Sequence, residues 1–377
     1  MKHLRIFLKI SIILFFFFSC IYLLYFINNN KNLFQEVVNK ERYKEKFDQS
    51  QWIITNKNKN VISDADLYTH IGIEYIKGVD PTTQNFEIPP LGKYLIGSSV
   101  VIFFNQRIFS LIFALFCLLL IFYLVYINTH SIFPSLLATS LTMTSWFFLD
   151  QIVNAPQMEI FQLFFLLCLF LFFSLYEKKT KKRYLILAGL SAGGFLSIKF
   201  FFVHYFLLMI MFTSYYFISK KKLRKILIDL SVINLFIFLI YVGYYYRFFL
   251  LGESVIEFLQ IQKWIIGFYL KSGIETAKIF AGYLPLIYAN RWQFWSKGYP
   301  IIHYDYWSIT WPIIHSAGIM SLIFLYTKKY MQKNPFYKLL AIFIIIYSIF
   351  LLFTPIWPRY LLLLFVPLQM VISLFII

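Results

Sequence analysis

The stretch that decides the fold is IFLKISIILFFFFSCIYLLYFI, residues 6–27. It exceeds the length of about 20 residues that a helix needs to cross about 30 Å of hydrocarbon, and it lacks the alternation of a barrel strand. Basic residues precede it, as in a signal peptide, but the apolar core is too long and no small-x-small cleavage site follows. We therefore interpret this run as an uncleaved first membrane span.

Similar apolar runs recur along the whole chain. The sequence is 60% hydrophobic and 22% aromatic, and only 14% of its 377 residues are charged, against about a quarter in soluble domains. The three cysteines lie inside apolar runs, which favours buried apolar positions over a disulfide or a zinc site. The composition predicts an all-α polytopic membrane protein with a single transmembrane domain, residues 1–377. We place its spans at residues 6–27, 107–127, 131–148, 155–176, 184–198, 200–218, 226–248, 309–326, 339–353 and 360–377.

The positive charges set the predicted orientation. Four segments on one side of this layout, residues 1–9, 177–183, 220–225 and 328–338, carry 3, 5, 5 and 4 of the 35 Lys and Arg residues. Short loops rich in Lys and Arg face the cytoplasm, so we expect a cytoplasmic N-terminus in a cell membrane such as the bacterial cytoplasmic membrane. The net charge of +18 then matches anionic lipid headgroups rather than nucleic acid.

Two long segments, residues 28–106 and 249–308, remain on the outer, extracytoplasmic side, and we expect the function to lie there. In the first of these outer loops, residues 34–47 have charges at helical spacing and predict a surface helix. Residues 91–104 are apolar but too short to cross, so they predict a helix along the outer interface.

The first outer loop combines acids, a diproline and a cation near the point where the chain re-enters the membrane. The residues concerned are Asp64, Asp66, Tyr68, Glu87, Pro89, Pro90 and Lys93. A diproline fixes two φ angles and can hold a loop in one shape, which would leave Lys93 at headgroup height. The alternative is that the two aspartates are solvated loop acids and the diproline is only a helix entry.

Further charged residues lie at the ends of the predicted spans. Glu159 enters a span, and an ionisable group at membrane depth is costly and usually faces a cavity, which favours a functional role. Several cations could hold an anionic ligand or could simply reach lipid headgroups: Arg107, Lys199, Arg247, Arg291 and Arg359. The second outer loop contains many aromatic rings around His303 and Asp305, a pattern that fits both an interfacial belt and a sugar platform.

The order of these motifs resembles that of the protein O-mannosyltransferases and aminoarabinose transferases, which are GT-C glycosyltransferases that use polyprenyl-phosphate sugars. The most specific part is the acid motif followed by Pro89-Pro90-Leu91-Gly92-Lys93. Three further motifs follow in the same order: Arg107-Ile108-Phe109-Ser110-Leu111, the Gly-rich residues 188–194 with Lys199, and Trp357-Pro358-Arg359-Tyr360. The family has Asp-Glu where this chain has Asp64-Ala65, and His where it has Ile88, so Asp66 stays open as the second acid.

The resemblance implies a GT-C-like bundle of about ten transmembrane helices, with interfacial helices in the large first outer loop. It implies inverting transfer of a sugar from a polyprenyl-phosphate donor to a hydroxyl of a protein, lipid or glycan. The implied catalytic residues are Asp64 or Asp66 as general base, with Asp64 the one that the family match favours, and Glu159 nearby. The implied phosphate ligands are some of Lys93, Arg107, Lys199 and Arg359, and the implied substrate-binding residues are Tyr68, Glu87, Pro89, Pro90, His303 and Asp305.

Two further expectations complete the hypothesis. No cofactor is certain, although a divalent cation between the acids and the phosphate fits the scheme, and Lys93 and Arg359 should lie near each other because both would reach one phosphate. The competing interpretation is a lipid or polysaccharide transporter or flippase. Such proteins carry inverted repeats and polar residues at the midplane, and the sequence shows no internal repeat.

Overall fold

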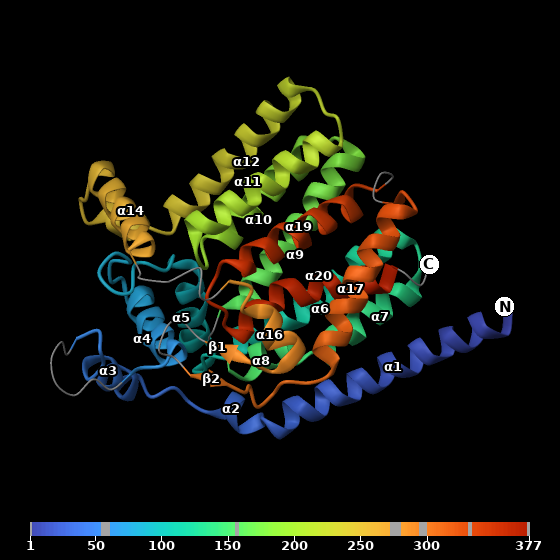
Figure 1. Ribbon diagram of the computed structural model, residues 1–377. Coiled ribbons are helices and arrows are strands. Elements are labelled where there is room, and N and C mark those ends of the chain that lie inside the picture. Colours follow the sequence, from blue (N-terminus) through green and yellow to red (C-terminus); the bar gives the residue numbers. More distant parts are fainter. Residues whose placement is uncertain are drawn as a thin grey trace.

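The computed structural model describes residues 2–53, 61–154, 158–271, 280–293, 300–330 and 334–374 (Figure 1). Most of this part of the chain is helical, and its one sheet is a short antiparallel pair. The elements are α1 (Lys2–Asn29), α2 (Lys31–Gln35), α3 (Lys40–Asp48), α4 (Asp64–Lys77), α5 (Leu91–Phe103), α6 (Ile108–Thr129), α7 (Ile132–Met143), α8 (Trp146–Val153), α9 (Glu159–Lys179), α10 (Lys182–Leu196), α11 (Phe201–Ile218), α12 (Leu223–Gly243), α13 (Tyr246–Leu250), α14 (Val255–Leu270), α16 (Tyr283–Ala289), β1 (Trp292–Gln293), β2 (Ile301–Ile302), α17 (Thr310–Thr327), α19 (Pro335–Leu352), the 3-10 turn η1 (Pro358–Leu361) and α20 (Leu362–Leu374). The prediction of an all-α polytopic membrane protein is confirmed.

Seven helices in the described residues are long and apolar enough to cross a membrane: α1, α6, α9, α11, α12, α17 and α19. Helices α7 and α8, which cover the span expected at residues 131–148, pass the same test only together and are bent by 57° at their junction, so they form either a broken span or a re-entrant loop. Helix α10 lies within two residues of the span expected at residues 184–198, and its 15 residues extend about 22 Å. It ends where the chain turns at Ser197, two residues before Lys199.

The first outer segment folds into small helices at one end of the bundle (Figure 1). The surface helix expected at residues 34–47 is split: α2 ends at Gln35, and α3 begins after Asn39, whose side chain accepts a hydrogen bond from Arg42 N. Helix α5 occupies the position of the expected interfacial helix. Helix α4 was not predicted, and it starts with the two acids of the first outer loop, after the capping residue Ser63.

Helices α4 and α5 touch through their backbones. An added Cβ atom at Gly97 would lie 2.0 Å from the carbonyl oxygen of Gly72, and one at Gly72 would lie 2.4 Å from the carbonyl oxygen of Lys93. Only glycine allows this approach. The pair of helices is therefore one compact unit, which fixes the position of the α4 N-terminus.

The basic loops and the outer segments lie at opposite ends of the bundle (Figure 1). At the C-terminal end of α9, Glu177 pairs with Lys221 and Lys225 of the next basic segment, and Lys178 donates a hydrogen bond to Asn128 at the end of α6. The N-terminal end of α9 lies beside α4. The charge pattern predicts this separation of the two ends. That the basic end faces the cytoplasm stays a prediction.

Candidate functional site

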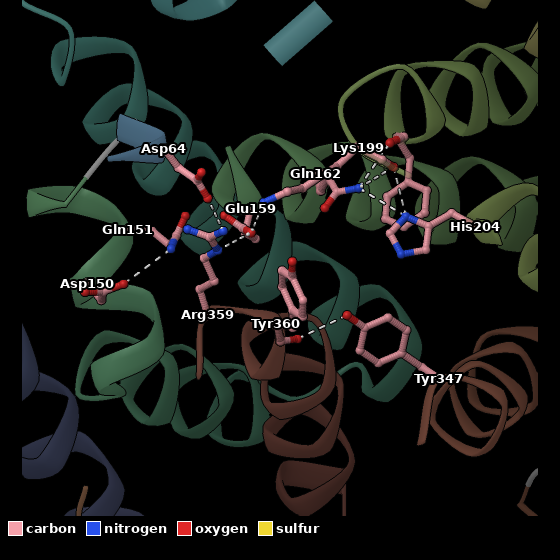
Figure 2. Close-up of polar contacts among 11 residues, drawn as sticks. Asp64, Asp150, Gln151, Glu159, Gln162, Lys199, His204, Tyr347, Arg359 and Tyr360 are labelled. Atoms are coloured by element: carbon pink, nitrogen blue, oxygen red, sulfur yellow. Dashed lines mark hydrogen bonds and ion pairs between the residues drawn. The ribbon is translucent and has the colours of Figure 1, made fainter. Parts of the chain in front are cut away.

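Four charged side chains meet at the end of the bundle where α4 lies (Figure 2). Arg359 lies between two carboxylates: its Nη2 is 2.5 Å from Asp64 Oδ2, and its Nε is 3.1 Å from Glu159 Oε1. Lys199 Nζ is 2.6 Å from the same Glu159 oxygen. We call Asp64, Glu159, Lys199 and Arg359 the ionic cluster.

Each member of the ionic cluster lies at the start of a helix or in the short segment just before one. Asp64 and Glu159 are the first residues of α4 and α9, where the positive helix end favours a carboxylate. Lys199 lies in the break between α10 and α11, and Arg359 lies in η1, just before α20. Helix ends thus bring together side chains from distant parts of the sequence.

The ionic cluster is mostly removed from water. The side chains of Glu159 and Lys199 are 0% and 1% exposed, that of Arg359 is 9% exposed, and that of Asp64 is 42% exposed. Two acids balance two bases, as the cost of burying unpaired charge requires. Burial raises the pKa of Asp64, but the charges of Arg359 and Lys199 outweigh it and lower the pKa below its usual value. Asp64 is therefore a carboxylate at neutral pH.

A second layer of polar groups holds Lys199. Gln162 lies one turn after Glu159 on α9, and its amide donates a hydrogen bond to the Lys199 carbonyl at 3.3 Å. His204 Nδ1 lies 3.1 Å from the same carbonyl and 3.3 Å from the Gln162 amide (Figure 2). Sequence reasoning missed Gln162 and His204. The signal that could have found Gln162 is its spacing of three from Glu159, which puts both on one helix face.

The two acids of α4 have different partners. Asp66 Oδ2 is 2.8 Å from Lys46 Nζ of α3, so it faces away from the ionic cluster. Tyr68 follows Asp64 by one turn and is buried, and burial together with the Asp64 charge raises the pKa of its hydroxyl. Asp64, rather than Asp66, is the acid that the structure brings to Glu159, Lys199 and Arg359.

Lys93, which was expected at headgroup height, is fully buried inside the protein. Its ammonium donates hydrogen bonds to the carbonyls of Ile88, at 2.9 Å, and Asn85. Glu87 is also buried and accepts a hydrogen bond from the Asn85 side chain. Burial lowers the pKa of Lys93 to about 7, against the opposing effect of Glu87. Lys93 thus closes the turn that precedes the diproline, and its contact with a phosphate stays a prediction.

The diproline docks beside the ionic cluster. Pro89 and Pro90 are buried, and the next residue, Leu91, donates its N–H to the carbonyl of Ser197 at 3.1 Å. Ser197 begins the break that carries Lys199. The first outer loop and the Lys199 turn therefore support each other.

Other predicted site residues lie apart from the ionic cluster. Arg107 pairs with Glu36 at 3.2 Å and donates from Nε to the carbonyl of Val153 at 2.9 Å, which ties the start of the first outer loop to α8. His303 and Asp305 are exposed, and His303 Nδ1 lies 2.8 Å from the carbonyl of Asn290. Among the described residues, no group of three or more His, Cys, Asp or Glu side chains is arranged to hold a metal ion.

The described residues thus combine spanning helices, a first outer segment of small helices and an acid of that segment beside buried cations. The crystal structure of the Archaeoglobus fulgidus oligosaccharyltransferase in the apo form, an enzyme of the GT-C fold, has a similar fold, with a TM-score of 0.52 and 14% sequence identity. The match covers 82% of this chain and 45% of the archaeal chain, so this chain spans about half of that protein's length. No family model and no curated protein matches the sequence. The resemblance to GT-C enzymes is confirmed at the level of the fold.

Proposed function

We propose that this chain is a membrane glycosyltransferase that moves a sugar from a polyprenyl-phosphate donor to an acceptor hydroxyl on the outer face of the membrane. The GT-C fold supports the class of enzyme. The observation that carries the proposal is the pairing of Asp64 with Arg359 above the buried Glu159 and Lys199. A carboxylate and two cations in contact are what a base and an anion-binding site require.

In the proposed reaction, the acceptor hydroxyl loses its proton to Asp64 as its oxygen bonds to the anomeric carbon. The bond from that carbon to the phosphate oxygen breaks, and the electron pair leaves with the polyprenyl phosphate. Direct displacement inverts the anomeric centre. General-base assistance of this kind contributes about 10²- to 10⁴-fold in rate. Arg359 and Lys199 stabilise the negative charge that grows on the phosphate, an effect that is often larger.

The partners follow from this scheme. The donor is a polyprenyl-phosphate sugar, and the acceptor is a hydroxyl of a protein, lipid or glycan. Glu159 keeps the two cations in place, and Gln162 and His204 position the turn that carries Lys199. Tyr68 is buried one turn after Asp64 on α4.

One observation favours a second candidate, a lipid transporter or flippase. The α7 and α8 pair is a bent span, and broken helices are a feature of secondary transporters. The ionic cluster, however, lies at helix ends on one side of the bundle rather than at its middle. The glycosyltransferase therefore stays the proposal, and the assay below separates the two.

The test compares Asp64→Asn with Asp66→Asn in proteoliposomes supplied with a panel of undecaprenyl-phosphate sugars and acceptors. We expect Asp64→Asn to lower the rate of transfer by about 10²- to 10⁴-fold, because it removes the base. We expect Asp66→Asn to keep most of the activity, because its partner is Lys46 and not the ionic cluster.

Three other outcomes have clear meanings. Full activity in both variants rejects the carboxylate mechanism, and the reverse ranking moves the base to Asp66. Movement of intact lipid without cleavage of the sugar makes the protein a transporter. Size-exclusion profiles in detergent check that both variants are folded.

A further inference from the structure

We propose that Asp64 occupies, in the resting protein, the place on Arg359 that the donor phosphate takes, and that donor binding releases Asp64 to act as the base. This inference rests on the proposed function and adds an order of events to it. The anionic donor binds first and the acceptor hydroxyl is activated second.

The first step of the argument is that the ionic cluster holds no spare positive charge. Arg359 already contacts Asp64 and Glu159, and Lys199 already contacts Glu159. Two carboxylates neutralise two cations. A phosphate that binds to this cluster therefore competes with the carboxylates for Arg359, whose Nη2 donates to Asp64 and whose Nε is buried and makes no hydrogen bond.

The second step identifies the carboxylate that leaves. Glu159 is 0% exposed, and its Oε1 contacts both cations, so its release would strand a buried charge. The Asp64 side chain is 42% exposed, and it meets Arg359 through one oxygen and one nitrogen. Asp64 can therefore exchange Arg359 for water at a lower cost.

A buried polar atom of the ionic cluster also points to a ligand. Among the described residues, Glu159 Oε2 is buried and has no hydrogen-bond partner. A buried carboxylate oxygen without a partner is costly, and a donor group from a bound molecule would satisfy it. A sugar hydroxyl next to the phosphate supplies such a donor, which places the sugar above Glu159 and the phosphate on Arg359.

The third step is that α4 stays in place when Asp64 moves. The helix cap is the Ser63 side chain, which accepts from Asp66 N at 3.1 Å and does not involve Asp64. The contact of Gly72 with Gly97 and the pair of Asp66 with Lys46 also hold the helix. The exchange is thus a movement of one side chain.

The exchange also increases the affinity of the Asp64 carboxylate for a proton. In the resting protein, Arg359 and Lys199 lower its pKa, so it takes up a proton weakly. When a phosphate accepts the Arg359 Nη2 hydrogen bond in place of Asp64, the influence of Arg359 on Asp64 falls and the negative charge of the phosphate is added nearby. Asp64 then becomes the stronger base that the acceptor needs, and only while the donor is bound.

The experiment measures binding of undecaprenyl phosphate to the full chain in nanodiscs, for wild type, Asp64→Asn and Glu74→Gln. Glu74 is a matched control because it is another paired acid on α4, with Lys77 as its partner. We expect Asp64→Asn to bind on the order of fivefold more tightly than wild type, because the competing charge is gone. We expect Glu74→Gln to bind like wild type.

The outcomes separate this inference from the proposed function. Equal or weaker binding by Asp64→Asn than by wild type overturns the inference and leaves the glycosyltransferase in place. Absence of binding to every variant overturns both. Asp64→Ser repeats the test in case the introduced asparagine amide accepts a hydrogen bond from Arg359.

A kinetic readout with wild type gives a second, independent check. The acid limb of kcat reports the donor-bound protein, and that of kcat/KM reports the free protein. The inference requires the acid limb of the kcat profile to lie at higher pH than the acid limb of the kcat/KM profile. If the two limbs coincide, the inference is overturned.

Discussion

Lys93 is a buried cation with backbone partners, and this makes protein stability depend on pH. The folded protein releases its proton near pH 7, because burial lowers the pKa from 10.5 to about 7. The unfolded chain keeps the proton until about pH 10.5. The unfolded state therefore binds more protons in this window, and the contribution of Lys93 to stability improves as the pH rises.

The prediction is tested with Lys93→Met, which has similar length and no charge. We expect the free energy of unfolding of wild type to rise relative to this variant by about 1 to 2 kcal/mol between about pH 7 and pH 9. Thermal unfolding in detergent at several pH values measures the difference. Parallel pH profiles for the two proteins would show that Lys93 stays charged in the folded state.

The residue pattern narrowed the candidate site to a few charged residues, and only the family resemblance favoured Asp64 over Asp66. Asp64 and Asp66 diverge by about 200° on a helix, so which of them reaches the ionic cluster depends on the position of α4. That position is fixed by the close contact of α4 with α5 at Gly72 and Gly97, which the sequence does not reveal. The burial of Lys93 was equally out of reach, since its partners are loop carbonyls that only the folded turn brings together. Glu159 was found because a carboxylate entering a span is costly without a partner.

At the scale of elements, the α4–α5 pair decides where Asp64 stands. We expect Gly97→Ala to lower the free energy of unfolding by about 1 to 3 kcal/mol, because its methyl group would collide with the Gly72 carbonyl. Transfer activity should fall as well, since the separation of the helices moves Asp64 away from Arg359.

Gly267→Ala in α14 is the matched control for this change. An added Cβ atom at Gly267 meets nothing within 4 Å, and alanine favours a helix interior over glycine by about 0.5 to 1 kcal/mol. We expect this variant to be slightly more stable than wild type. Equal melting temperatures for the two alanine variants would mean that the α4 and α5 backbones do not touch.

Most helices were predictable from hydrophobic runs, and the errors have physical reasons. The bend between α7 and α8 falls at Thr144 and Ser145. Hydrophobicity averaged over a whole span hides two polar residues of this kind. The break after α10 was predictable, because Ser197 and Lys199 interrupt the apolar run, but the sequence did not show that the chain turns there so that Lys199 meets Glu159. A hydrophobic run therefore predicts which segments can enter a membrane, but it does not predict where the backbone turns.

At the scale of the whole molecule, the two ends of the bundle should face different sides of the membrane. The prediction is tested with single cysteines in a background in which Cys20, Cys117 and Cys168 are replaced. An impermeant thiol reagent on intact cells should label Val61→Cys and Lys271→Cys, which are exposed in the outer segments.

The matched positions at the other end are Lys179→Cys and Lys222→Cys, also exposed, and these should react only after the cells are opened. The physical reason is the excess of Lys and Arg in the short loops of that end. Labelling of these two positions and not of the outer pair would reverse the orientation, and with it the proposed access to an outer-leaflet donor.

The ionic cluster also has a consequence for how the protein is made. Lys199 follows Glu159 by 40 residues, whereas Arg359 follows Asp64 by 295. At ordinary rates of synthesis, Arg359 leaves the ribosome about 15 to 60 s after Asp64. During that delay the nascent chain can already pair Glu159 with Lys199, and Asp64 remains in water until Arg359 arrives with α20. The ionic cluster is therefore completed late in translation. A chain arrested before residue 359 lacks the ion pairs of Arg359, and chaperones and membrane proteases can recognise the unpaired Asp64.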